Sequence, residues 1–248
     1  MSVRSYLVIF VSTSGLACGQ VDPPDPATSS AGGSTGDSVE LKSLYPLVPG
    51  SSWVYRHTNA TGNVTGLEFV NLSATMWTDF QGNQREAFLL ADEEDGAGRA
   101  SRSYIIRDGS AALRVHKEVA TKGVVELEVD YNPGFLRADD AWKSGPGPAV
   151  GWSYTRTAIG TALEGEQPDV DERSHDYKVI AVDVEITVDA GTFNCVHVRR
   201  TRTSGNQEGE VVNYWFAPGV GKVKEHRDNS VDGVSEELLD AVMVPGVR

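Results

Sequence analysis

The chain has 248 residues, of which 40% are hydrophobic and 23% are charged, and its formal net charge is −13. This composition can build a folded core, so it excludes collagen, coiled coil and a wholly disordered chain. The acidic excess argues against a protein that binds nucleic acid, because phosphate binding depends on lysine and arginine.

The first residues have the order of a secretory signal. Arg4 supplies a positive charge, residues 6–11 form a short apolar segment, and Gly15 and Ala17 lie at positions −3 and −1 before Cys18. The apolar segment is far shorter than the roughly 20 residues that a membrane-spanning helix needs. Residues 1–17 are therefore predicted to be a signal peptide.

Cys18 is the predicted lipidation site. The segment resembles the signal of bacterial lipoproteins, in which the cysteine after the cleavage site is acylated with fatty acids such as palmitate. It departs from that pattern because Leu16 stands at −2 and Gly15 at −3, and an ordinary signal peptidase can also cleave such a site. The resemblance implies export and a membrane anchor. Gly19 after the cysteine favours the outer membrane, on its periplasmic or surface face.

Residues 18–44 are rich in Ser, Thr, Gly and Pro and are predicted to be a disordered tether behind the lipid. The folded domain is predicted to span residues 45–244. If Cys18 carries lipid, Cys195 has no cysteine partner, whereas without lipid a Cys18–Cys195 disulfide can form. Cys195 lies in a strand-like segment and is interpreted as a small buried residue rather than a nucleophile.

Alternation of apolar and polar residues dominates the domain. Between Ile180 and Val188 every second residue is Ile or Val, as in an antiparallel strand with one face in water. Further strands are expected at residues 53–58, 66–72, 85–90, 102–106, 111–115, 125–131, 152–159, 196–203, 210–216 and 220–226. Short glycine-containing turns separate them, among them Asp95-Gly96, Asp108-Gly109 and Asp232-Gly233. Residues 235–243 suit either a short helix or a closing strand.

The predicted fold class is mainly β, a curved antiparallel sheet or half-barrel with little helix. Two halves, residues 45–147 and 148–244, are suggested by a weak repeat: Trp53 and Tyr55 recur as Trp152 and Tyr154, each 99 residues later. The alternative is that Trp-x-Tyr often begins a strand, because aromatic residues suit a pleated surface.

Both ends of the domain resemble a group of uncharacterised secreted or lipid-anchored bacterial proteins. The residues that carry this resemblance are YPLVPGSSWVY at 45–55, VDAGTFNC at 188–195 and YWFAPGVGKV at 214–223. These proteins are similar to domains of unknown function whose curved half-barrel is related in shape to periplasmic lipoprotein carriers. The resemblance implies that fold and a place in the cell envelope, and it brings no catalytic residue.

No motif for catalysis, a cofactor or a metal is recognisable. The G-x-S-x-G match at residues 32–36 lies in the tether, where no strand and helix can form a nucleophile elbow. A partial calcium loop at 228–233 lacks the carboxylate of its twelfth position. The five histidines have no companion at a metal-binding spacing and are interpreted as strand residues: His57, His116, His175, His197 and His226.

Aromatic residues at strand ends are the candidate ligand-binding residues, with plugs of the core as the alternative. They are Trp53, Tyr55, Trp152, Tyr154, Tyr214 and Trp215. The sequence thus predicts a lipid-anchored envelope protein, more a binding or structural module than an enzyme, whose partner is an apolar ligand or an envelope protein. The alternatives are a carrier of an apolar ligand and a secreted hydrolase with a site assembled across strands. The oligomeric state stays open.

Overall fold

Twelve β-strands and one short 3₁₀-helix make up the described part of the chain in the computed structural model. The described residues are 40, 42–79, 82–93, 98–160, 168–229 and 233–247. All of them belong to the unit Ser34–Arg248. The predicted signal peptide, Cys18 and the match at residues 32–36 lie outside the described residues. No helix among the residues described is long and apolar enough to cross a membrane.

The elements follow one another in the order β1 Ser52–Asn59, β2 Val64–Thr78, β3 Gln84–Asp92, β4 Arg99–Asp108, β5 Ala111–Thr121, β6 Val124–Asp139, η1 Asp140–Ser144, β7 Val150–Gly160, β8 Asp169–Val188, β9 Gly191–Ser204, β10 Val211–Ala217, β11 Gly221–Asn229 and β12 Gly233–Met243. Every expected strand is therefore confirmed, as is the low helix content.

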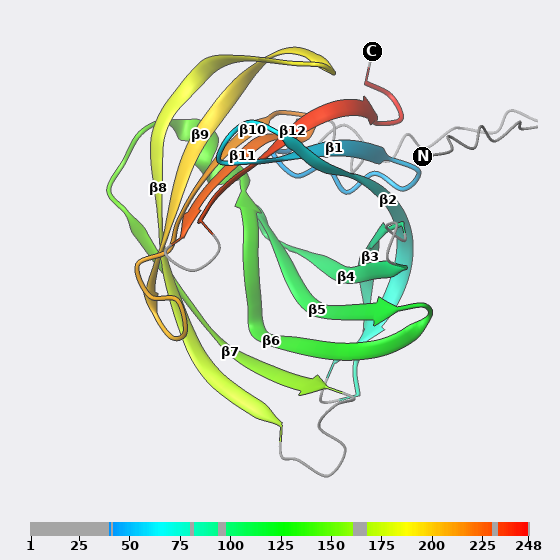
Figure 1. Cartoon of the computed structure of the whole chain (residues 1–248). Helices are drawn as coiled ribbons and strands as arrows, with labels where there is room; N and C mark the ends of the chain where they lie inside the picture. The colour runs from blue at the N-terminus through cyan, green and yellow to red at the C-terminus, as the bar shows by residue number, and fades with distance from the viewer. Residues whose placement is uncertain are drawn as a thin grey trace, which may run out of the picture. The chain divides into compact units, whose positions relative to one another are not determined.

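The sheet closes into a barrel. Each strand pairs antiparallel with its neighbours in the chain, and β1 pairs with both β2 and β12, from Ser52 opposite Met243 to Asn59 opposite Ser235. In Figure 1 the red strand β12 accordingly lies beside the blue strand β1. The prediction of a half-barrel is wrong, because the last strand satisfies the edge that β1 would otherwise expose.

The helix expected as one alternative at residues 235–243 does not form, and the other alternative, a closing strand, is confirmed. Leu239 is fully buried and lies opposite Tyr55 of β1. Pairing on both sides of β12 satisfies its backbone groups across two neighbouring strands, which outweighs the weak helical pattern.

Residues 42–50 precede β1 and pack into the barrel. Leu44 and Leu47 are 0% and 2% exposed and contribute to its two main apolar clusters. Arg107 of β4 holds this segment by donating to the carbonyl of Tyr45 at 2.8 Å, and it also bonds to the carboxylate of Glu40 at 2.7 and 3.0 Å. Leu44, which was predicted to be the last residue of the tether, is thus part of the core.

Candidate functional site

The inward faces of several neighbouring strands change from apolar to charged along their length. In β9 the face that carries Val198 goes on to carry Arg200. The strand register sets Glu225 of β11 opposite Glu237 of β12, and Glu237 opposite His57 of β1. Residues opposite one another in an antiparallel pair have Cβ atoms about 4.5–5.5 Å apart, so these charged groups meet. The interior therefore has an apolar part and a charged part.

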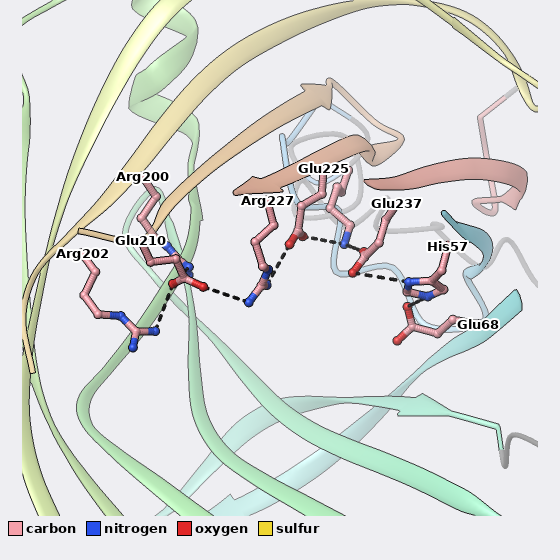
Figure 2. A network of polar contacts seen from close by, with 9 residues as sticks. His57, Glu68, Arg200, Arg202, Glu210, Glu225, Arg227 and Glu237 are labelled. Atoms are coloured by element: carbon pink, nitrogen blue, oxygen red, sulfur yellow. Dashed lines mark hydrogen bonds and ion pairs between the residues drawn. The ribbon is translucent and has the colours of Figure 1, made fainter. Parts of the chain in front are cut away.

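Glu210 is the centre of the first group of ion pairs in the charged part (Figure 2). Its side chain is 1% exposed and accepts from Arg200 at 2.7 Å, Arg202 at 3.1 Å and Arg227 at 3.1 Å. One buried carboxylate thus contacts three guanidinium groups. Buried charges of this kind are stable only when they are paired.

Lys222 and Arg227 continue this network toward β12. Arg227 contacts Glu225 at 2.9 Å, and Lys222 contacts Glu225 at 3.0 Å and also bonds to Glu237. Burial would raise the pKa of Glu225, but the charges on Lys222 and Arg227 outweigh it and hold that pKa well below its usual range. Glu225 is therefore a fixed anion.

His57 ends the network at β1 (Figure 2). Its Nε2 lies 3.3 Å from Glu68 Oε2, and its Nδ1 lies 3.9 Å from Glu237 Oε1. The hydrogen bond to Glu68 raises the pKa of His57, against the effect of burial. These residues come from three adjacent strands, so no spacing in the sequence indicates that they meet.

Arg114 and Arg137 also face the charged part, and neither forms an ion pair with any described residue. The Arg114 guanidinium lies 5.3 and 5.1 Å from the ring centres of Tyr131 and Phe135, and its Nε is buried without a partner. Arg137 lies 5.8 Å from the Phe135 ring. Burial, followed by repulsion from the other positive charge, lowers the pKa of Arg114. Burial would lower the pKa of Arg137, but Tyr45, Tyr214 and Glu225 outweigh it and raise that pKa. Neither cation thus has a carboxylate of the described residues in direct contact, as a buried cation normally has.

An inner cavity of about 320 Å³ lies among these side chains. Of the described residues, eight basic ones line it against four acidic ones, in a chain whose net charge is −13. The basic residues are Arg114, Lys117, Arg137, Arg173, Arg200, Arg202, Lys222 and Arg227, and the acidic ones are Glu68, Asp92, Glu225 and Glu237. The interior is therefore cationic although the protein is acidic.

The inner cavity adjoins a second hollow, of about 730 Å³, which we call the mouth. Among the described residues, only Phe88 to Ala91 of β3 pair with β4. The first half of β2, the start of β4 and the second half of β5 line this hollow. Glu68, Asp92 and Lys117 border both spaces. The mouth and the inner cavity thus meet at these three side chains.

Two ionisable side chains at the boundary between the inner cavity and the mouth have pKa values shifted toward neutral pH. Burial, and then the charge on Glu68, raises the pKa of Asp92 to about 6. Burial, and then the charge on Arg114, lowers the pKa of Lys117 to about 8. Asp92 also accepts a hydrogen bond from Ser101. Asp92 and Lys117 therefore change their protonation states close to neutral pH.

His175 is buried next to the charged part and is 0% exposed. Its ring stacks on Tyr154, whose hydroxyl lies 3.1 Å from Nε2, and its Nδ1 has no partner. Burial, and then repulsion from Arg200 and Arg202, lowers the pKa of His175 to about 3. The imidazole is neutral at physiological pH.

The six aromatic residues that were predicted to bind a ligand lie in different parts of the barrel. Tyr154 and Tyr214 line the inner cavity. Trp53 and Tyr55 line a neighbouring recess of about 70 Å³, where Trp53 donates a hydrogen bond to the carbonyl of Val220 at 2.7 Å.

The other two aromatic residues border neither the inner cavity nor the mouth. Trp152 donates to the carbonyl of Gly134 at 2.8 Å, and Trp215 stacks on His197 with ring centres 4.4 Å apart. Trp53 lies near the start of β1 and Trp152 near the start of β7. Trp53 lines the recess, whereas Trp152 bonds to Gly134 outside it. The two-half organisation stays a prediction.

Cys195 is 1% exposed, and burial raises the pKa of its thiol to about 12. The interpretation as a small buried residue is confirmed, because a nucleophile needs an accessible thiolate.

No protein-family profile matches this chain, and no curated protein matches it significantly. Two solved structures are similar. An inferred exported protein with a YmcC-like fold from Bacteroides fragilis NCTC 9343 has 12% identity and a TM-score of 0.46, over 80% of this chain and 98% of its own. An inferred lipoprotein from Parabacteroides distasonis ATCC 8503 has 15% identity and a TM-score of 0.34, over 82% and 99%. Similarity this low assigns neither a family nor a function.

Proposed function

We propose that this protein is a non-catalytic binding module of the cell envelope, and that its barrel holds a small organic anion in the inner cavity. The observation that carries this proposal is the pair Arg114 and Arg137, two cations without an ion pair at a cavity with a basic excess. A carboxylate or phosphate group would supply the missing counter-charge through charge-assisted hydrogen bonds. The rings of Phe135 and Tyr214 would contact a short apolar part of the same ligand.

The other candidate functions fit the cavity less well. A wholly apolar ligand would remove water from charged side chains without replacing its hydrogen bonds, which is costly. A hydrolase needs a carboxyl group free to exchange a proton with its substrate. Among the described residues that line the cavity, Glu225 and Glu237 bond to Lys222, and Glu68 bonds to His57. Asp92, whose pKa burial raises to about 6, is the one carboxyl group left among them for proton exchange, and it has no second free carboxyl group to work with.

Isothermal titration with hexanoate and with its neutral analogue hexanamide tests this function. We expect hexanoate to bind and hexanamide to bind at least about tenfold more weakly, because hydrogen bonds to a charged group contribute about 1.5–3 kcal/mol. R114Q and R137Q should each weaken hexanoate binding by about tenfold or more. The matched control is R102Q, since the Arg102 side chain is 62% exposed on the outer surface. Equal binding of both probes, or unchanged binding by R114Q, would contradict the proposal.

We also propose that Cys18 anchors the barrel to the outer membrane through a lipid. The order of Arg4, an apolar segment, Gly15, Ala17 and Cys18, with a polar tether behind it, supports this location. Mass spectrometry of the mature chain should find Cys18 as a diacylated first residue. C18S is expected to move the protein from the membrane fraction to the soluble fraction. An unmodified Cys18, or a mature chain that begins elsewhere, would reject the anchor.

A further inference from the structure

An unassigned cluster lies where β1, β2 and β12 meet. His57, Glu68 and Glu237 each offer one donor atom, and these atoms lie within 4.8 Å of one another. The 3.3 Å between His57 Nε2 and Glu68 Oε2 matches the roughly 3.3–3.5 Å between neighbouring ligands of tetrahedral zinc with bonds of about 2.0–2.2 Å. The Glu237 carboxylate lies 3.9 Å from the other imidazole nitrogen, Nδ1.

We propose that His57, Glu68 and Glu237 bind one divalent transition-metal ion, with Zn²⁺ as the representative ion. One imidazole with two carboxylates is a ligand set that suits zinc and its neighbours, whereas calcium takes oxygen ligands. The register of three paired strands holds the backbones of all three residues in place. This site does not depend on the proposed anion.

The cluster is accessible from the mouth, which His57 and Glu68 both line. A metal with three protein ligands keeps a fourth position for water or for a group of a bound solute. Asp92 lines the same mouth and shares with Glu68 the boundary to the inner cavity. The surroundings thus offer an entry path.

Lys222 is the competitor for this site. It bonds to Glu237 and lies 3.0 Å from Glu225, so its ammonium group occupies one ligand and repels a cation. Metal binding requires Glu237 to exchange Lys222 for the ion. A structural salt-bridge network and a metal site therefore differ in one expected outcome: removal of the lysine charge strengthens zinc binding at a metal site, whereas a structural network binds no zinc with or without the lysine.

The chain offers a matched control on β11 and β12. His226 lies 3.1 Å from Glu236, and Lys224 lies 2.9 Å from the same carboxylate. This trio repeats the His57, Glu237 and Lys222 arrangement without a second carboxylate. It belongs to no metal-holding group among the described residues.

Equilibrium dialysis against ZnCl₂ tests the site on the whole mature chain, without a histidine tag and with C18S in every variant so that no exposed thiol competes. We expect one zinc per chain. H57Q and E68Q should each weaken binding by at least about tenfold, H226Q should leave it unchanged, and K222M should tighten it by about tenfold.

Circular dichroism verifies that each variant is folded, and H57Q and E68Q serve as independent tests if one of them is not. Co²⁺ provides a second readout, since its visible absorption should appear in the parent protein and disappear in H57Q. Absence of saturable zinc binding, unchanged binding by both H57Q and E68Q, or weaker binding by K222M would overturn the proposal.

Discussion

Replacement of Glu210 by glutamine is expected to lower the free energy of unfolding by about 3–5 kcal/mol, the usual cost of leaving a buried charge without its partner. The Glu210 side chain is 1% exposed, and those of Arg200 and Arg202 are 5% and 9% exposed. E210Q keeps the shape of the side chain but removes the only carboxylate within 4 Å of these two arginines among the described residues. Urea unfolding at neutral pH measures the loss.

The control for this change is E208Q, two residues earlier in the chain. Glu208 is exposed, so its substitution should change the free energy of unfolding by no more than about 0.5 kcal/mol. If E210Q costs less than about 1 kcal/mol, water in the inner cavity already screens the arginines, and the ion pairs around Glu210 do not stabilise the barrel.

Acidification from pH 6.5 toward pH 4.5 is expected to destabilise the barrel through His175. Burial and repulsion from Arg200 and Arg202 lower the pKa of His175 to about 3, whereas an unfolded histidine has a pKa of about 6.5. Between these values the unfolded chain binds a proton that the native chain does not. The free energy of unfolding therefore falls as the pH falls, by at most about 1.4 kcal/mol per pH unit.

H175F removes this contribution, so its stability relative to the parent protein should rise as the pH falls. Y154F is the matched variant, because it loses the contact of 3.1 Å between the Tyr154 hydroxyl and His175 but keeps the imidazole. Its pH dependence should run parallel to that of the parent. Asp92 binds a proton in the native state up to about pH 6 and acts in the opposite direction, equally in all three proteins. Parallel curves for H175F and the parent would contradict the assignment.

The strands were predictable because each one carries its own local pattern. In residues 180–188 the alternation alone indicates a strand with one wet face, and the structure has β8 there. The turns were predictable for a similar reason, since Asp108-Gly109 and Ala190-Gly191 place glycine where the backbone adopts a positive φ. Cys195 was correctly interpreted as buried from its place in such a pattern.

The charged interior was missed although a signal for it was present. Arg200 and Arg202 stand at the same alternate positions as Val196 and Val198, so a strand whose inward face is apolar at one end must turn charges inward at the other. The aromatic residues at strand ends were predicted to bind the ligand instead. Among them, Trp215 stacks on His197 and borders neither the inner cavity nor the mouth.

Local order along this chain, from strand positions to turns, follows from the amino acids themselves, because pleat, propensity and turn chemistry act over a few residues. Closure of the barrel does not, since it depends on the pairing of Ser52–Asn59 with a strand almost 180 residues away. The same holds for the meeting of His57, Glu68 and Glu237, and for Arg114 and Arg137 at one cavity. Such contacts arise from register around a closed sheet, which relates residues by their height in the barrel and not by their distance in the chain.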